Sequence, residues 1–289
     1  MSGIGFGTPI EPEGPAGPSA LDTARRGSQR RNTLISAVST VVFFALVIGV
    51  IAASPGANKV LDSFFSTTGF EDSFEPIVDG FWLNVKLMLV AEAFVLVLGL
   101  LVAVIRSLPG PVLAPLRLVA LIYTDVFRGI PLILVIFMIG LGLPALRLEF
   151  FSTLSVFTYG VISLVLVYSA YVAEVYRAGI ESIHPSQVAG ARSLGLTQFQ
   201  SMRFVILPQA IRRVIPPLLN DFIGLQKDTA LLSVVGLLEV LSRARLVSNE
   251  LFNLSPTLAA GVAFVVITIP LARFTDWLVA RQARARMAG

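Results

Sequence analysis

The residues best suited to chemistry in this chain are charged side chains that lie within otherwise apolar segments. One group lies close together: Asn220, Asp221, Lys227, Asp228 and Thr229. Because successive residues of an α-helix are about 100° apart, all of these except Thr229 project from one side of a helix. Charged residues within membrane helices normally face a bundle interior or a water-filled path. The spacing therefore predicts that these residues line a polar path through the membrane, with Thr229 on another face.

Arg128 is a second candidate for binding, because it lies in the segment FRGIP. Glycine and proline interrupt a helix at this point, and broken transmembrane helices often form solute sites near the middle of the membrane. Asp125 precedes Arg128 by one turn, so an ion pair within one helix is the alternative. Lys227 could likewise pair with Asp221 or Asp228 and only hold helices together.

Two other carboxylates lie in apolar segments. Glu174 precedes Arg177 by three residues, which favours a local ion pair over a solute ligand. Glu92 is expected to face the interior of the protein because a charge facing lipid is costly.

The composition excludes several other kinds of chemistry. The chain has no cysteine, so it offers no disulfide, thiolate metal site or cysteine nucleophile. Its one histidine, His184, cannot hold a metal ion alone and is expected to be solvated or to cap a helix. No nucleophile stands in a recognisable arrangement with a base. We therefore predict neither a catalytic residue nor a metal site.

The elements that must position these residues are membrane helices. The chain has 289 residues, of which 55% are hydrophobic and 14% charged, and its mean hydropathy is +0.81. Soluble domains are about 25% charged, and about 20 apolar residues span a bilayer as a helix. We predict an all-α integral membrane protein with about six transmembrane helices, at 34–53, 80–105, 118–142, 157–177, 210–236 and 257–279. The alternating pattern of a membrane β-barrel is absent.

The basic residues predict the orientation of these helices. Residues 1–33 are rich in glycine and proline and then basic, which is typical of a disordered tail. The run 34–53 is longer than the core of a typical signal peptide, so an uncleaved helix is favoured over a cleaved signal. Most Lys and Arg residues fall in the tails and in the second and fourth connections, whereas the first loop, 54–79, is acidic. The positive-inside rule then places both termini in the cytoplasm. The positive charge is a topology signal and does not indicate nucleic-acid binding.

The connection between the fourth and fifth runs predicts two short helices outside the membrane. Pro185 suits the first turn of a helix, and Gly195 suits the left-handed residue that follows a helix end. Thr197 and Gln200 have the spacing of a capping box at the start of a second helix. About ten residues of helix reach only about 15 Å, too short to cross a bilayer. Such an element either enters a groove of another protein or lies on lipid headgroups.

This connection resembles the cytoplasmic coupling loop of ABC importer permeases, whose pattern is E-A-A, three residues, Gly, nine residues and I-x-L-P. Ala189, Gly190 and Ala191 stand at the E-A-A position, Gly195 at the glycine, and Leu207–Pro208 at the end of the motif. Ala189 replaces the family's glutamate. The stretches YTDVFRGIPLILVIFMIGLGLP, YVAEVYRAGIESIHPSQ and KDTALLS are similar to permeases of polar amino acid importers of the histidine/glutamine type. The resemblance covers about 80–280.

The resemblance implies a five-helix permease domain over 80–280, with a coupling loop at about 181–208, preceded by one additional helix and followed by a basic tail at 281–289. It implies import of a polar amino acid across the bacterial cytoplasmic membrane by alternating access. The implied partners are two ATPase subunits, which bind ATP and Mg²⁺, a second permease subunit, identical or a sister chain, and an extracytoplasmic solute-binding protein. This chain lacks a phosphate-binding loop of the form G-x-x-x-x-G-K-[ST], so it is not expected to be an enzyme or to hold a cofactor.

Substrate identity is less well defined by the residues. Arg128 and Lys227 weakly favour glutamate or another acidic amino acid, whereas Asp221 and Asp228 would suit an amine. The alternative function is an ion-coupled secondary transporter of a small polar solute. Secondary transporters often contain inverted repeats, and no second copy of FRGIP or of the polar helix is visible.

Overall fold

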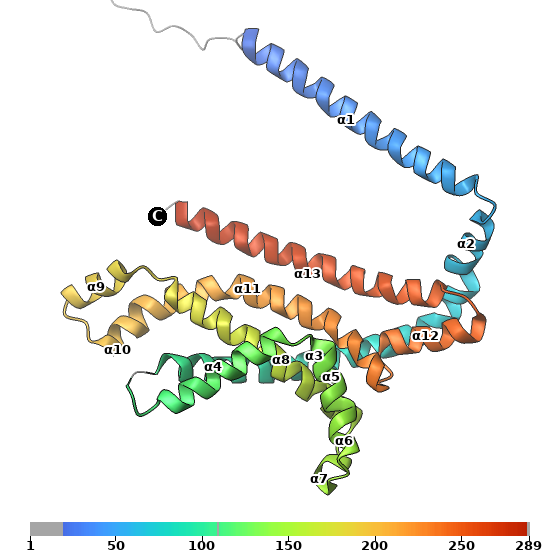
Figure 1. Cartoon of the computed structure of the whole chain (residues 1–289). Helices are drawn as coiled ribbons and strands as arrows, with labels where there is room; N and C mark the ends of the chain where they lie inside the picture. The colour runs from blue at the N-terminus through green and yellow to red at the C-terminus, as the bar shows by residue number, and fades with distance from the viewer. Residues whose placement is uncertain (1–19, 109, 288–289) are drawn as a thin grey trace, which may run out of the picture. The chain divides into compact units, whose positions relative to one another are not determined.

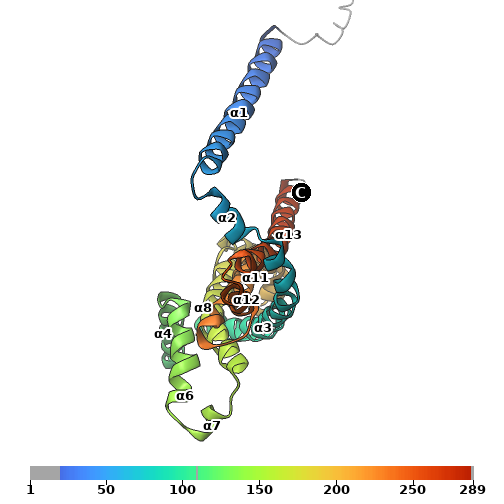
Figure 2. The ribbon, with the colours of Figure 1, turned by 90° about the vertical axis from the view of Figure 1, so that its right-hand side faces the viewer.

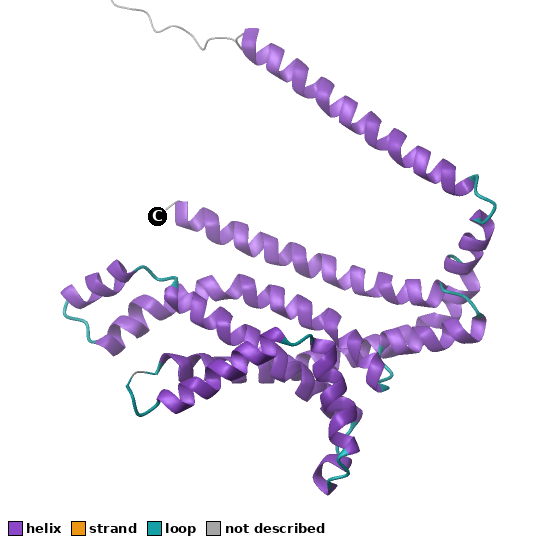
Figure 3. Ribbon diagram, in the orientation of Figure 1, coloured by secondary structure: helices purple, strands orange, loops and turns teal. Residues whose placement is uncertain are grey.

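The computed structural model describes residues 20–108 and 110–287, and every regular element within them is a helix (Figure 3). The chain divides into two compact units, residues 1–61 and 62–289. All of the predicted site residues belong to the second unit.

The first unit is dominated by one long helix, α1 (Ala20–Ala52). The helix starts well before residue 34, so the expected disorder does not extend over 20–33, while residues 1–19 of the predicted tail lie outside the described part of the chain. No proline follows Pro18 before the end of α1, so nothing in the backbone chemistry stops the helix there. Its apolar part, Arg31–Ala52, has a mean hydropathy of 2.7 and exposes its large aliphatic and aromatic side chains, as a lipid-facing helix does.

The second unit is a helix bundle (Figures 1 and 2). Its long helices are α3 (Thr67–Ser107), α4 (Ala114–Gly129), α8 (Val156–Glu181), α11 (Leu207–Asp228), α12 (Val240–Leu251) and α13 (Ser255–Met287). Its shorter elements are α5 (Leu132–Phe137), η1 (Met138–Gly142), α6 (Leu143–Ala145), α7 (Glu149–Ser152), α9 (Pro185–Ser193), α10 (Gln198–Ser201), η2 (Met202–Ile206) and η3 (Thr229–Val235), while α2 (Ala57–Phe64) spans the boundary between the two units. Helices α9 and α10 lie at one end of the bundle and α12 at the other (Figure 1).

The helices agree with the predicted membrane segments, and the main difference lies at the start of α3. Four described segments are long and apolar enough to span a bilayer, and a bent pair, α4 with α5–α6, makes a fifth. The remaining predicted span corresponds to α11, which is 22 residues long but carries Arg212, Arg213 and Asp221, so hydropathy alone does not mark it. Much of the predicted loop 54–79 is helical, because Ser66 caps α3 by accepting from the Gly69 N–H and the helix begins there.

Helix α8 forms the centre of the bundle and packs tightly against α3 and α11. A Cβ built on Gly99 of α3 would lie 2.7 Å from Cγ1 of Val172, and one built on Gly179 of α8 would lie 2.1 Å from Cγ1 of Val214. Lipid tails are as apolar as the helices, so close packing through small residues is a main source of helix association in membranes. Each of these glycines therefore allows two helices to approach closely.

Candidate functional site

The interruption predicted at FRGIP is a sharp break between two helices. Helix α4 ends at Gly129, Ile130 is extended with φ −92° and ψ 132°, and α5 begins after Pro131. The helices on the two sides of the break make an angle of 105°. Proline has no N–H and disfavours a helical conformation at the residue before it, which explains why the helix stops at this position.

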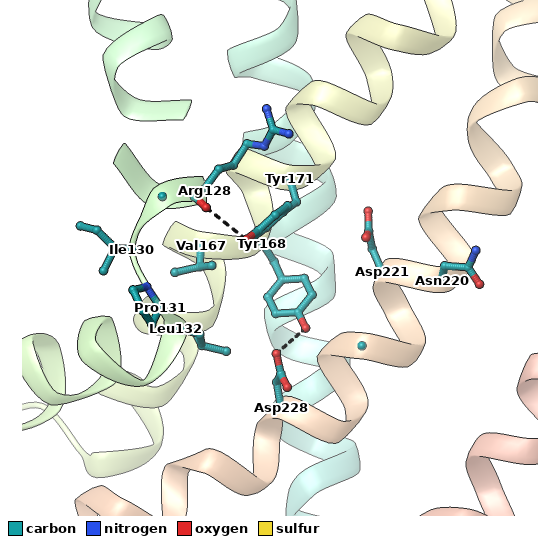
Figure 4. Close-up of a pocket in the computed structure, with 12 residues that line it drawn as sticks. Arg128, Ile130, Pro131, Leu132, Val167, Tyr168, Tyr171, Asn220, Asp221 and Asp228 are labelled. Atoms are coloured by element: carbon teal, nitrogen blue, oxygen red, sulfur yellow. Dashed lines mark hydrogen bonds between the residues drawn. The ribbon is translucent and has the colours of Figure 1, made fainter. Parts of the chain in front are cut away.

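A cavity of about 470 Å³ adjoins this break (Figure 4). Three elements contribute to it: the joint between α4 and α5, the middle of α8, and one face of α11. Its lining residues are Arg128, Gly129, Ile130, Pro131, Leu132, Val167, Tyr168, Tyr171, Asn220, Asp221, Gly224 and Asp228. The structure therefore brings Arg128 together with Asp221 and Asp228, which follow it by about a hundred residues in the sequence. All three were predicted to line a path.

The carboxylates of the cavity differ in their hydrogen bonding. Asp228 Oδ2 accepts a hydrogen bond of 2.7 Å from the Tyr168 hydroxyl (Figure 4). Asp221 Oδ2 is buried and has no hydrogen-bond partner among the described residues. A buried carboxylate oxygen without a partner is costly. Asp221 thus offers an acceptor that a solute's N–H group would satisfy.

Arg128 supplies the positive charge of the cavity. Its side chain is 41% exposed, and Nη1 lies 3.9 Å from Oε2 of Glu174. The guanidinium lies 5.9 Å from the centre of the Tyr171 ring, within the range of a cation–π contact. The alternative ion pair with Asp125 is not formed in the described part of the chain. The Arg128 side chain is therefore partly accessible to a solute.

Glu174 forms the predicted pair with Arg177 but also contacts two other arginines. Arg177 donates to both carboxylate oxygens of Glu174, and Arg106 Nη1 lies 2.9 Å from Oε2. With Arg128 at 3.9 Å, three arginines from α3, α4 and α8 surround one carboxylate. The ion pairs of Glu174 thus connect three helices beside the cavity.

Two of the predicted path residues lie outside the cavity lining. Lys227 is exposed and does not line the cavity. Thr229 is fully buried, and its hydroxyl accepts from Nδ2 of Asn84 at 2.8 Å and donates to the carbonyl of Gln226 at 2.7 Å. Its hydroxyl is therefore occupied, and Thr229 supports the end of α11 from behind the cavity.

Sequence reasoning missed the two tyrosines of α8. Tyr168 and Tyr171 are three residues apart and so lie on one face of the helix, which is a visible signal. The sequence does not reveal which helix packs against that face. In the structure α11 does, and a Cβ on Gly224 would lie 3.1 Å from the Tyr168 hydroxyl.

The predicted loop with its glycine hinge is confirmed in detail. His184 caps α9 through its ring Nδ1, which accepts from the Ser186 N–H at 3.2 Å, and Pro185 takes the first turn. Gly195 has φ +82°, the left-handed conformation expected after a helix end. Thr197 and Gln200 form the capping box of α10.

The rest of this loop exposes apolar side chains. Ala189, Gly190, Leu207 and Pro208 are exposed, and Ala191 is buried. The π-helix η2 leads directly into α11, in which Pro208 occupies the first turn, where its missing N–H is tolerated. Leu194, Phe199 and Phe204 are among the most exposed large apolar residues of the second unit. An apolar surface of this kind, at the end of a membrane bundle, is suited to binding another protein.

A bundle of apolar helices around a charged cavity, with a broken helix beside it, defines a multi-pass membrane transport protein. The chain belongs to the family of binding-protein-dependent transport system inner membrane components, which matches residues 96–284. It is 38% identical over 213 residues to the probable glutamine ABC transporter permease protein GlnM of Bacillus subtilis, covering 73% of this chain and 94% of that protein. It is 35% identical to the probable amino-acid ABC transporter permease protein PatM of Vibrio harveyi, covering 66% of this chain and 85% of that protein.

Solved structures agree with this assignment. The crystal structure of an amino acid ABC transporter with histidines matches with a TM-score of 0.68 and 31% identity, over 73% of this chain and 96% of that chain. An inward-facing structure of the MetNI methionine ABC transporter matches with a TM-score of 0.59 at 19% identity, covering 73% of this chain and 98% of that chain, and supports the fold alone.

Proposed function

We propose that this chain is the membrane-spanning subunit of an ATP-driven importer of polar amino acids and that the cavity at the α4–α5 break binds the solute. The observation that carries the proposal is the meeting of Arg128 with Asp221 and Asp228 in one cavity. A zwitterionic amino acid stripped of water needs a partner for each of its charges. The relatives named as glutamine or amino-acid permeases support this class of solute.

The charge balance of the cavity bears on the preference for an acidic amino acid. That preference depends on Arg128 and Lys227, and only Arg128 lines the cavity. The guanidinium of Arg128 also lies 3.9 Å from the carboxylate of Glu174, so part of its charge is already balanced. The cavity therefore supports a zwitterion more strongly than an additional negative charge. Competition of labelled glutamine uptake by glutamate and by arginine decides this point, since an acidic preference requires glutamate to compete best.

The proposed partners bind at different sides of the membrane. Hydrolysis of ATP with Mg²⁺ is assigned to two separate ATPase subunits, which bind the loop that contains Ala189, Gly190, Ala191, Gly195 and Leu207–Pro208. A second permease subunit, identical or a sister chain, completes the pathway, and a solute-binding protein delivers the amino acid from outside. In this arrangement α9, α10 and both termini are cytoplasmic, as the positive-inside rule predicts from the basic residues of these segments.

Uptake by the complete complex in proteoliposomes tests the cavity. Arg128→Gln and Asp228→Asn should assemble with the ATPase and slow uptake by about tenfold or more, since each removes one charged partner of the solute. Lys227→Met should have a smaller effect because Lys227 does not line the cavity. Asp125→Asn is the matched control, because Asp125 is exposed on α4 one turn from Arg128 and lies outside the lining.

Two results would contradict the proposal. If the charges only hold helices together, Arg128→Gln and Asp228→Asn should fail to assemble with the ATPase, whereas the proposal expects them to assemble and transport slowly. Uptake that continues without ATP but requires an ion gradient would instead establish the secondary transporter.

A further inference from the structure

A buried hydrogen-bond network joins α3, η3 and α12 behind the cavity. Its side chains belong to Asn84, Thr229 and Glu239, and each of these residues has no exposed surface. Asn84 and Glu239 lie 155 residues apart in the sequence. Burying this much polar surface is costly unless every group is paired, so the network has a defined geometry.

Glu239 connects the network to the start of α12. Its Oε1 accepts from the Ser242 N–H at 2.8 Å, and its Oε2 accepts from the Leu241 N–H at 2.9 Å. Oε2 also accepts from Nδ2 of Asn84 at 3.3 Å. In the described part of the chain no Lys or Arg side chain forms an ion pair with Glu239. Its carboxylate is therefore held by amide donors at a helix N-terminus, which favours a negative charge.

Asn84 uses all of its polar atoms to join three elements. Nδ2 donates to Thr229 and Glu239, and Oδ1 accepts from the Val240 N–H at 3.0 Å. The backbones are also in close contact, because a Cβ on Gly80 would lie 2.6 Å from Cα of Val240. Helix α12 therefore cannot shift against α3 without breaking these bonds or moving Asn84.

Thr229 continues the connection to the cavity. It directly follows Asp228, which is the last residue of α11, and it begins the 3₁₀-helix η3. Its hydroxyl is fixed by Asn84 on one side and by the Gln226 carbonyl on the other. The position of the Asp228 backbone is thus tied through two hydrogen bonds to the start of α12.

We propose that the Asn84–Glu239 contact is a positioning joint, which couples movement of α12 to movement of Asp228 in the solute cavity. The proposal rests on the proposed function, in which the end of the bundle that carries α12 faces the solute-binding protein. A binding protein that displaces α12 would move Asp228 through Asn84 and Thr229. Asn84 and Glu239 do not line the cavity, so they act through Asp228 instead of binding the solute.

The test exchanges the donor and the acceptor of the joint. Glu239→Gln leaves an oxygen to cap α12 but opposes two amide groups, and Asn84→Asp opposes two carboxylates. In the double variant Asn84→Asp/Glu239→Gln, the new amide at position 239 can donate to the new carboxylate at position 84, which still accepts from Val240. The contact with Thr229 is kept if its hydroxyl turns from the Gln226 carbonyl and donates to the same carboxylate. The readout is the ratio of ATPase activity with and without glutamine-loaded binding protein, measured on the complete complex in proteoliposomes.

We expect each single variant to assemble with normal basal ATPase activity and to lose about tenfold of the stimulation, and the double variant to recover most of it. A purely structural role predicts instead that basal activity and assembly fall together, which would overturn the proposal. So would normal stimulation in both single variants, or a double variant as impaired as the singles.

A second pair of variants keeps the test decisive if the single variants fold poorly. Thr229→Val removes the hydroxyl that Asn84 contacts at nearly constant volume, whereas Thr229→Ser retains it. Loss of stimulation in Thr229→Val alone supports the joint, and equal stimulation in both variants refutes it. Asp228→Asn, measured for uptake in the same vesicles, reports separately on the cavity, so failure of the joint and failure of the proposed function give different results.

Discussion

Gly195 offers the sharpest test of the loop between α8 and α11, because its role can be separated from packing. The residue has φ +82°, and a Cβ added to it would have nothing within 4 Å. A substitution there is thus opposed by backbone strain alone, without a steric clash against a neighbour. Gly190, in the middle of α9, also has open space around it but has an ordinary helical backbone.

The expected magnitude follows from this geometry. A residue with a Cβ in the left-handed region costs about 1–2 kcal/mol, and a β-branched residue is disfavoured further. At 1.4 kcal/mol for each factor of ten, Gly195→Ala should reduce the population of the native hinge by about tenfold and Gly195→Val by more. Gly190→Ala should instead stabilise α9 by up to about 1 kcal/mol, since alanine favours a helix over glycine.

The assay is co-purification of the ATPase with the permease, together with uptake in proteoliposomes. We expect Gly195→Ala and Gly195→Val to insert at normal levels, to bind the ATPase more weakly in that order, and to lose uptake in proportion. Normal association and uptake in Gly195→Val would refute the reasoning. Equal losses in Gly190→Ala and Gly195→Ala would show that the surface matters and the hinge angle does not.

The remaining predictions concern topology and packing. The cysteine-free chain permits thiol labelling without background, and a reagent that cannot cross the membrane should label Asp72→Cys and miss Gly190→Cys from outside; the reverse pattern would invert the orientation. Gly179→Ala should lower the thermal midpoint in detergent, because its Cβ would lie 2.1 Å from Val214 Cγ1 and overpacking costs about 1–3 kcal/mol. A Cβ on Gly261 of α13 has nothing within 4 Å, and alanine favours a helix over glycine, so Gly261→Ala should not lower the midpoint; an equal decrease in both variants would contradict the packing argument.

The sequence predicts best those features that are decided within one or two turns of chain. The break after Gly129, the left-handed Gly195 and the capping box of Thr197 and Gln200 each depend on local backbone chemistry, and each is present. The helix periodicity of α11 also predicted that Asp221 and Asp228 share a face, and both line the cavity. These signals need no knowledge of what packs against the helix.

Features that depend on neighbouring helices were harder to predict. Periodicity placed Lys227 on the same side of α11 as Asp228. The cavity, however, adjoins only part of that side, and Lys227 does not line it. Thr229 was expected in the path, but its hydroxyl is occupied by Asn84, which is 145 residues away in the sequence. Glu174 was paired correctly with Arg177, but its contact with Arg106 depends on α3 and α8 lying side by side.

The glycine contacts on both sides of α8 determine how the bundle can move. Val172 is seated against Gly99 of α3, and Val214 of α11 is seated against Gly179. A side chain in such a notch cannot slide along the neighbouring helix without leaving a void, and an unfilled void forfeits dispersion energy. The three helices are thus held in register at these two contacts, and Val214 lies between the loop with Gly195 and Asp221 in the sequence. In the proposed importer, displacement of that loop would be passed to the cavity through these contacts, whereas the break at 129–131, where Gly129 has no such contact, is free to bend.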